Sequence, residues 1–128
     1  MNDKKFKDQL DRLANHRKHR HHDFSMVVGG AMYTVINHQQ RKALDLSLVE
    51  YCVTDAIYNF SSSPKSKEIG GWCFAKKEFI ADCLSLELET VEQAVDRLIE
   101  RGFVIMDPAT KFLRTDDKWY LEIVAYKN

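Results

Sequence analysis

Histidines are concentrated in one short segment of this 128-residue chain. His16, His19, His21 and His22 are followed by Asp23, and imidazole and carboxylate groups are common ligands of Zn²⁺. His19 and Asp23 would share a face only if the segment were helical, because residues four apart are neighbours on a helix. The chain has no matched second cluster of such ligands. We therefore expect neither a resident metal ion nor another cofactor.

The sequence does not indicate nucleophilic catalysis. Cys52, Cys73 and Cys83 form no CxxC pair, and each lies in an apolar stretch, which favours reduced thiols buried in a core. Motifs such as GxSxG, GxxxxGKS/T, GxGxxG and HExxH are absent. The chain begins with a polar segment and has no run of about 18 apolar residues. We expect a cytoplasmic protein that is not an enzyme and has no membrane segment.

Charge is distributed unevenly along a chain that has 19 Lys and Arg and 19 Asp and Glu. Residues 1–42 contain nine basic and four acidic side chains, a net charge of +5, so residues 43–128 carry −5. We predict a basic arm over residues 1–23 and a domain over residues 24–128. Arg17, Lys18 and Arg20 in the arm could contact phosphates without a fold of their own. A solvated run of charge explains the same residues equally well.

The arm is predicted to contain a short amphipathic helix over residues 4–15. Phe6, Leu10 and Leu13 follow the spacing i, i+4, i+7 and would form a narrow apolar stripe. A helix this short is marginal in isolation. We expect it to dock on the domain or to pair with a second copy, which would make a homodimer.

Three longer helices are predicted in the domain. Ser47 followed by Glu50 matches a capping box, after which a helix runs to about Phe60. A second helix is predicted over residues 76–84 and a third over residues 90–101, where Gly102 would end it. The side chains expected to point inward are Leu48, Val49, Cys52, Val53, Ala56, Ile57 and Phe60 in the first, Phe79, Ile80, Cys83 and Leu84 in the second, and Val91, Ala94, Val95, Leu98 and Ile99 in the third.

Extended segments are predicted around these helices. β-branched and aromatic residues favour strands, and Asp, Pro and Gly mark the turns between them. The expected strands cover residues 33–36, 72–74, 103–106, 112–114 and 119–126, and residues 61–67 are expected to be a loop. The predicted order is therefore helix, short strand, helix, turn, helix and β-wing.

The segment GWCFAKKEFIADCLSLELETVEQAVDRLIERGFV resembles the helix-turn-helix core of winged-helix proteins. It is most similar to the N-terminal domains of phage and plasmid replication initiators. Trp72 and Phe74 match their short strand, Thr90 and Val91 match the start of the recognition helix, and Gly102 matches its exit into the wing. The resemblance covers roughly residues 32–124. It implies an α+β winged helix-turn-helix fold, with a three-helix core plus a β-wing.

This resemblance implies a DNA-binding protein of a mobile element, acting in phage or plasmid replication initiation or in transcriptional control. In such proteins the recognition helix lies in the major groove and the wing touches the minor groove or the backbone. The candidate contacts to duplex DNA are Thr90, Gln93, Arg97 and Arg101 on the helix and Lys111, Arg114 and Lys118 on the wing.

The predicted recognition helix departs from this pattern because it is acidic. Glu92, Asp96 and Glu100 are expected to face outward, and carboxylates are repelled by phosphates. Acids near a helix N-terminus also stabilise the helix through its dipole. Two interpretations stay open. The helix contacts DNA, or the chain is a winged-helix protein-interaction module whose acidic helix faces a protein partner.

Overall fold

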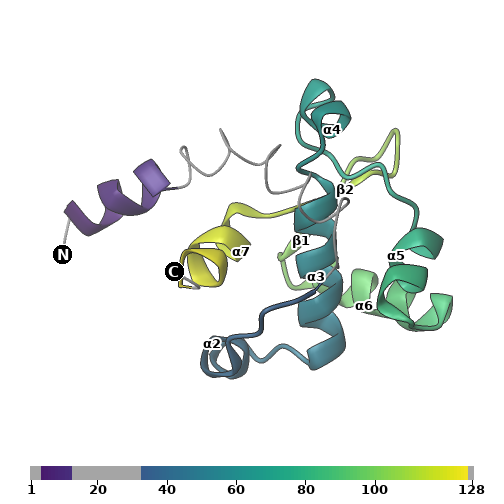
Figure 1. Cartoon of the computed structure of the whole chain (residues 1–128), viewed down its shortest axis with the longest axis horizontal. Coiled ribbons are helices and arrows are strands. Elements are labelled where there is room, and N and C mark those ends of the chain that lie inside the picture. Colours follow the sequence, from purple (N-terminus) through teal and green to yellow (C-terminus); the bar gives the residue numbers. More distant parts are fainter. Residues whose placement is uncertain (1–3, 13–32, 127–128) are drawn as a thin grey trace.

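The structure is a computed structural model and describes residues 4–12 and 33–126 (Figure 1). It is a mixed α and β fold, as predicted, in which helices predominate and one small antiparallel sheet is present. Residues 4–12 are helical. The remaining elements are α2 (His38–Ala43), α3 (Leu48–Phe60), α4 (Pro64–Glu68), α5 (Lys77–Leu84), α6 (Leu88–Glu100), β1 (Val104–Met106), β2 (Leu113–Thr115), α7 (Asp117–Glu122) and the 3-10 helix η1 (Val124–Tyr126).

Helix α3 lies at the centre, with α5 and α6 on one side and α7 on the other (Figure 1). Its predicted capping box is confirmed. The backbone N–H of Glu50 donates to Ser47 Oγ over 3.0 Å, and the N–H of Ser47 donates to Glu50 Oε1 over 2.8 Å. Val53 and Ile57 are fully buried, as predicted. Leu48 is 51% exposed instead, because it begins the helix beyond the reach of the packed core.

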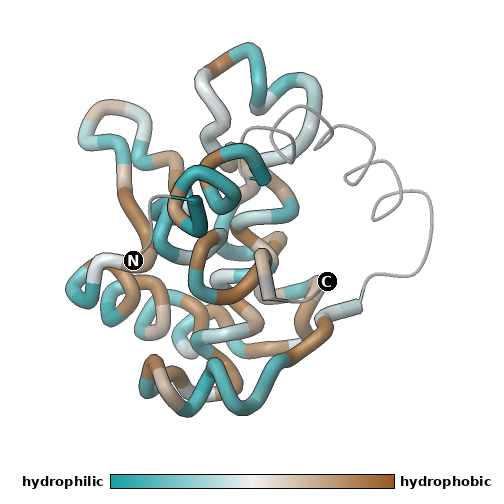
Figure 2. The backbone as a smooth tube through the Cα atoms, turned by 90° about the vertical axis from the view of Figure 1, so that its left-hand side faces the viewer, coloured by the Kyte–Doolittle hydropathy of each residue, from teal (hydrophilic) through white to brown (hydrophobic). Residues whose placement is uncertain are grey.

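Helices α5 and α6 follow each other in the chain and are joined by a short turn. Ser85, at φ 55°, makes the turn between them, and Gly102, at φ 80°, follows the end of α6. Left-handed backbone of this kind costs least at glycine, which explains Gly102. Of the five predicted inward residues of α6, Val91, Ala94, Val95 and Leu98 are buried, and Ile99 is partly buried against the core. Figure 2 shows hydrophobic and hydrophilic stretches alternating along the backbone, as elements packed around one core require.

The inward face of α5 was predicted wrongly at two positions. Phe79 is 52% exposed and Cys83 is exposed, whereas Ile80 and Ala81 are buried. This helix has only eight residues and contacts the core through a narrow stripe. The buried face is shifted by about one residue from the predicted face. Phe79 keeps one edge on the Phe60 ring, with 5.3 Å between the ring centroids.

The sheet pairs β1 with β2 in antiparallel register, so that Val104 faces Thr115 and Met106 faces Leu113. Residues 72–74 lie beside β2 and pair with it through Cys73. The Cys73 N–H donates to the Leu113 carbonyl over 2.7 Å, and the Leu113 N–H donates back over 3.3 Å. The strands expected over 103–106 and 112–114 are therefore confirmed to within one residue.

The strand expected over 119–126 is wrong, because this segment forms α7 and η1. Asp116 caps α7, and its carboxylate accepts the Lys118 N–H over 3.0 Å. Trp119 and Ile123 are fully buried, and their i, i+4 spacing satisfies one helical face. The apolar residues of this segment fit both the alternation of a strand and the spacing of a helix, and the Asp116 cap favours the helix.

Two further segments differ from their predictions. The expected loop over 61–67 contains α4, which starts where Ser63 Oγ accepts the Ser66 N–H over 3.0 Å and Pro64 occupies the first turn. Residues 33–36 form no strand with any described segment. The Val35 carbonyl instead accepts the Tyr51 hydroxyl over 3.1 Å, which ties this stretch to α3.

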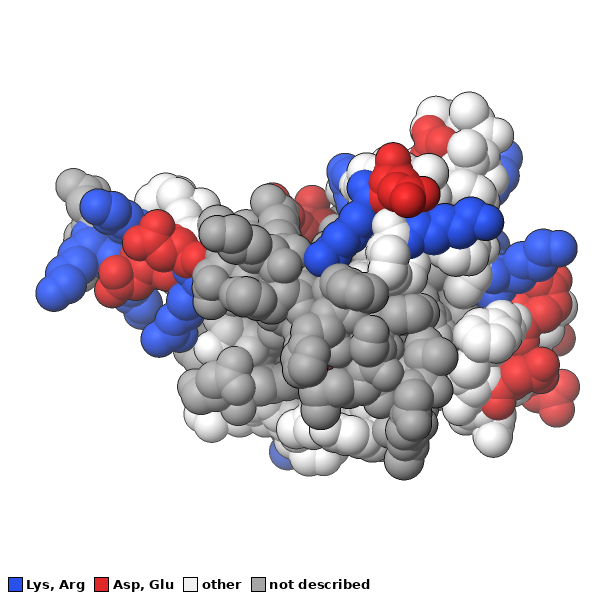
Figure 3. Space-filling view, turned by 45° about the horizontal axis from the view of Figure 1, so that its top comes forward, with Lys and Arg blue, Asp and Glu red and all other residues white. Residues whose placement is uncertain are grey.

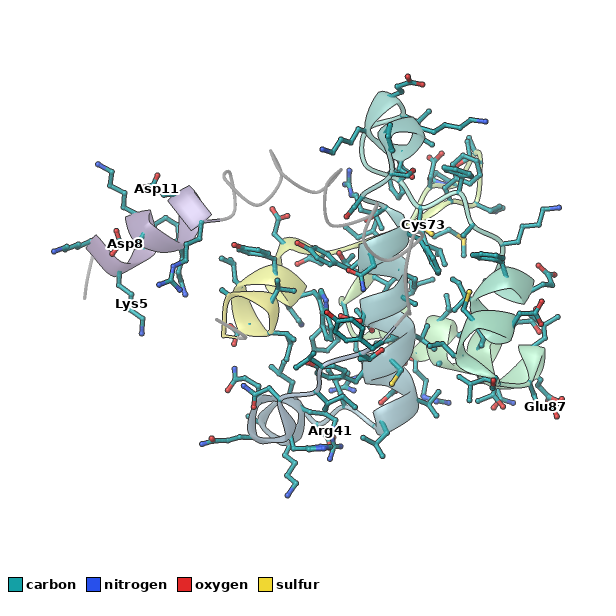
Figure 4. The ribbon with its side chains drawn as sticks, viewed as in Figure 1. Lys5, Asp8, Asp11, Arg41, Cys73 and Glu87 are labelled. Carbon is teal, nitrogen blue, oxygen red and sulfur yellow. The ribbon has the colours of Figure 1, made fainter. Side chains whose placement is uncertain are left out.

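The helical segment 4–12 lies beside α7 at one end of the molecule (Figures 1 and 4). Arg12 Nη1 donates to the Ala125 carbonyl over 3.5 Å, which links this segment to the domain. Phe6 and Leu10 remain exposed. The predicted arm residues Arg17, Lys18 and Arg20 and the histidine cluster lie outside the described residues, as does the end of the expected helix.

Candidate interaction surfaces

Helix α6 presents an exposed acidic surface. Its residues Glu89, Glu92, Asp96 and Glu100 are all exposed and follow helical spacing, so they lie on one side. We call these four residues the acidic face. Gln93, a predicted DNA contact, lies among them and donates to Glu89 Oε1 over 3.3 Å.

The acidic face belongs to a larger acidic end of the molecule. Figure 3 shows Asp and Glu side chains gathered where α5 and α6 meet, and Figure 4 shows Glu87 at that outer tip, directed away from the body. Thr90, another predicted DNA contact, is half-buried in the first turn of α6. A phosphate backbone approaching this helix would therefore meet carboxylates first.

Arg97 of α6 and Arg101, the residue that caps the end of α6, are bound to other parts of the protein. Arg97 Nε lies 3.0 Å from Glu50 Oε2. Arg101 donates to the Asp45 carbonyl over 2.8 Å and to the Leu44 carbonyl over 2.6 Å. The Arg97 bond attaches α6 to α3, and the Arg101 bonds attach its end to the turn between α2 and α3. Both arginines thus have a structural role, which their sequence spacing could not reveal.

Glu50 is the acidic partner in this arrangement and is only 5% exposed. Burial by itself would raise the pKa of Glu50, but hydrogen bonds from the Ser47 backbone and from Arg97 outweigh it and hold the pKa below its usual value. Arg101 Nη1 lies 3.8 Å from Glu50 Oε1 and adds a second cation. The ionised form of Glu50 is therefore stabilised in the folded protein.

Replacing Glu50 by glutamine is expected to lower the free energy of unfolding at neutral pH by about 1–3 kcal/mol. Glutamine can preserve the capping box, so the loss isolates the ion pair. We expect a value near the lower end, because the Arg97 side chain is half-exposed. A depressed pKa stabilises the fold above the usual value of 4.5, and this contribution disappears as the pH falls through the folded-state pKa.

Urea unfolding of the wild type and the Glu50→Gln variant, at neutral pH and well below pH 4.5, would measure this difference. The gap between the two proteins should narrow in acid. A gap of equal size at both pH values would contradict the assigned role of the Glu50 charge.

Lys118 does not lie on the wing, where it was predicted, because it belongs to α7. Its Nζ donates to the Arg101 carbonyl over 3.3 Å and lies 4.1 Å from the centroid of the Phe103 ring. It therefore caps the C-terminal end of α6. Lys111 does lie in the turn between β1 and β2, where it is exposed and has a φ of 67°.

Arg114, the third predicted wing contact, packs against an aromatic ring. Its Cζ lies 4.4 Å from the centroid of the Trp72 ring, and Nη1 lies 3.5 Å from the Gly70 carbonyl. Lys65 on α4 lies over Phe74 in a similar way, at 5.5 Å. The predicted DNA contacts therefore lie on two different surfaces. Those of α6 lie on an acidic helix, whereas Arg114 lies beside α4. The α4 lysines were missed because this segment was expected to be a loop.

A hollow of about 440 Å³ adjoins Arg114. The residues that line it mix cations, carboxylates, tyrosines and glycine backbone: Tyr58, Lys67, Gly70, Gly71, Ile105, Arg114, Thr115, Asp116, Asp117 and Tyr120. Asp116 is also the cap of α7. This mixture can accept a polar ligand group, and its cations are those of α4 and β2.

The cysteines are not grouped for chemistry. Cys73 is buried as predicted, and burial raises the pKa of its thiol to about 11, so it stays protonated at neutral pH. Cys52 is half-buried and Cys83 is exposed, so the prediction of three buried thiols holds fully only for Cys73.

No three potential metal ligands converge within residues 4–12 and 33–126. Over the same residues, every helix is too short or too polar to cross a membrane.

Comparison of the chain with protein-family models, with curated proteins and with solved structures gives no match. The order of its elements and the charges on its surfaces are therefore the observations from which a function can be proposed.

Proposed function

We propose that the chain is a winged helix-turn-helix module. The order of its elements supports this proposal. Helix α3 is followed by the short helix α4, by the extended segment at Cys73, by the α5–α6 pair and by the β1–β2 hairpin. The pairing of Cys73 with Leu113 joins the extended segment to the hairpin, as the short strand of a winged helix is joined to its wing. The α5–α6 pair would then be the helix-turn-helix, with α6 in the position of the recognition helix.

We infer that α6 binds a basic surface of a protein partner and does not enter a DNA groove. The acidic face carries this inference, because four exposed carboxylates occupy the side of α6 that a groove would have to accept. The cations that could offset them are engaged, Arg97 with Glu50 and Arg101 with backbone carbonyls. Complementary charge across an interface directs association and partner choice. A segment rich in Lys and Arg is the partner that fits.

A second candidate function is duplex DNA binding by a mobile-element protein, in replication initiation or transcriptional control. The exposed position of Lys111 in the wing turn favours it, as do the cations around α4. In this mode the wing and the basic arm would contact phosphates, and α6 would lie away from the duplex.

Fluorescence anisotropy with two labelled probes, a lysine- and arginine-rich peptide and a mixed-sequence DNA duplex, would separate these functions at low salt. We expect the full chain to bind the peptide, and the double variant Glu92→Gln, Asp96→Asn to bind it about tenfold more weakly. The variant Glu68→Gln, Glu122→Gln removes two carboxylates from α4 and α7 and is the matched control. It should bind as the wild type does.

Absence of peptide binding, or equal loss in the control, would overturn the role of the acidic face. Duplex binding that depends on Lys111 in place of peptide binding would support the second candidate. Duplex binding that is lost in the Gln93→Ala variant, which changes an exposed predicted DNA contact on α6, would show instead that α6 contacts DNA.

A further inference from the structure

One face of the small sheet carries aromatic and basic side chains. Cys73 and Leu113 pair across the sheet and both are buried, so they point toward the core. Side chains alternate along a strand, so the neighbours of these two residues point the other way. Ile105 pairs with Arg114, which places it on this outer side as well. We call the resulting group of Trp72, Phe74, Ile105 and Arg114 the outer sheet face.

The outer sheet face is accessible among the described residues. Phe74 is 40% exposed and Ile105 is 37% exposed. Trp72 and Arg114 are partly exposed and stack on each other, with 4.4 Å between Cζ and the ring centroid. Exposure of large aromatic and aliphatic side chains to water is unfavourable relative to their burial. A group of such exposed side chains therefore indicates a contact surface.

Positive charge is placed at the edge of this surface. Lys65 lies over the Phe74 ring, and Lys67 lines the adjoining hollow together with Arg114. Figure 3 shows Lys and Arg side chains over α4, with an acidic side chain between them, apart from the acidic end of α5 and α6. Asp116 and Asp117 also line the hollow, at the start of α7, so the cations dominate on the α4 side only.

We propose that the outer sheet face and the α4 lysines bind single-stranded nucleic acid. Unpaired bases would stack on Trp72, Phe74 and the Arg114 guanidinium, while Lys65 and Lys67 pair with phosphates. Exposed rings on a sheet face, bordered by cations, are a recurrent way of holding single strands. A duplex fits less well, because its base faces are covered by their neighbours in the stack. This surface is separate from the acidic face, so the two proposals can fail independently.

Anisotropy of labelled oligothymidylate and oligouridylate of about 15 nucleotides, with a duplex of the same length, would test this proposal on the full chain at low salt. We expect both single strands to bind more tightly than the duplex. The DNA and RNA probes distinguish which single strand is preferred. Binding should also quench tryptophan fluorescence, because Trp72 is accessible whereas the other tryptophan, Trp119, is fully buried.

The variants Phe74→Ala and Arg114→Ala are each expected to weaken single-strand binding about tenfold. Phe79→Ala removes a comparably exposed aromatic ring from α5, and Lys42→Ala removes an exposed cation from α2. These controls should bind as the wild type does. The proposal is overturned if neither single strand binds, or if the controls lose as much affinity as Phe74→Ala and Arg114→Ala. It is also overturned if the duplex binds equally well and Phe74→Ala has no effect, because phosphate contacts alone would then explain binding.

Discussion

Replacing Glu92 and Asp96 by lysine is expected to create duplex DNA binding, with a gain in affinity of at least about tenfold at low salt. Both residues are exposed on α6, on the side that would face the major groove if α6 is the recognition helix of the proposed winged helix-turn-helix. The two substitutions change the charge of this surface by four units, and each new cation can neutralise a phosphate and release counterions. Anisotropy of a labelled duplex at several salt concentrations would measure the gain.

The control for this prediction is Glu122→Lys on α7, compared with the single variants Glu92→Lys and Asp96→Lys so that each protein adds the same charge. We expect a smaller gain from the control, because α7 lies away from the proposed groove-facing side (Figure 1). Equal gains would show that net charge alone controls DNA binding. If the α6 variant stays folded and gains nothing, α6 does not occupy the position of a recognition helix, and the winged-helix proposal fails.

Replacing Trp119 by alanine is expected to lower the free energy of unfolding by about 3–5 kcal/mol. Trp119 is the largest fully buried side chain in the described part of the chain. Its ring lies edge-on to Tyr51 of α3, with 5.0 Å between the centroids, so the substitution would leave a cavity between α7 and α3. Chemical denaturation followed by far-ultraviolet circular dichroism would give the change, provided that enough of the variant folds to be measured.

Two further substitutions keep this prediction testable. Trp119→Phe should cost much less, because phenylalanine retains most of the apolar contact and Trp119 Nε1 has no hydrogen-bond partner among the described residues. Trp72→Ala removes the same side chain from the partly exposed outer sheet face and should cost about 1 kcal/mol or less. A loss from Trp72→Ala that equals the loss from Trp119→Ala would contradict the packing of α7 on α3.

The sequence alone determined those features that depend on neighbouring residues. The capping box of Ser47 and Glu50, the buried stripe of α6 and the position of Gly102 were all predicted, because caps and helical periodicity are local. The same applies to the hairpin that follows α6. The acidic charge of α6 was also evident, since the periodicity that identified its buried residues identified its exposed ones.

The local sequence pattern did not identify the secondary structure where it was compatible with two kinds of element. Trp119 and Ile123 suited an alternating strand as well as a short helix, and packing against α3 distinguishes the two. Ser63 was a capping signal inside a segment rich in loop-forming residues, so α4 and its lysines were missed.

The roles of the candidate site residues were decided by tertiary structure. Arg97 meets Glu50 from 47 positions away in the chain, and Arg101 meets the Asp45 carbonyl from 56 positions away. The stacking of Arg114 on Trp72 likewise joins two segments that the sheet brings together. Residue type showed that these side chains could carry positive charge to a ligand. Only the fold showed that the α6 arginines are engaged within the protein while Arg114 lies on an aromatic surface, because pairing between distant residues depends on where packing places them.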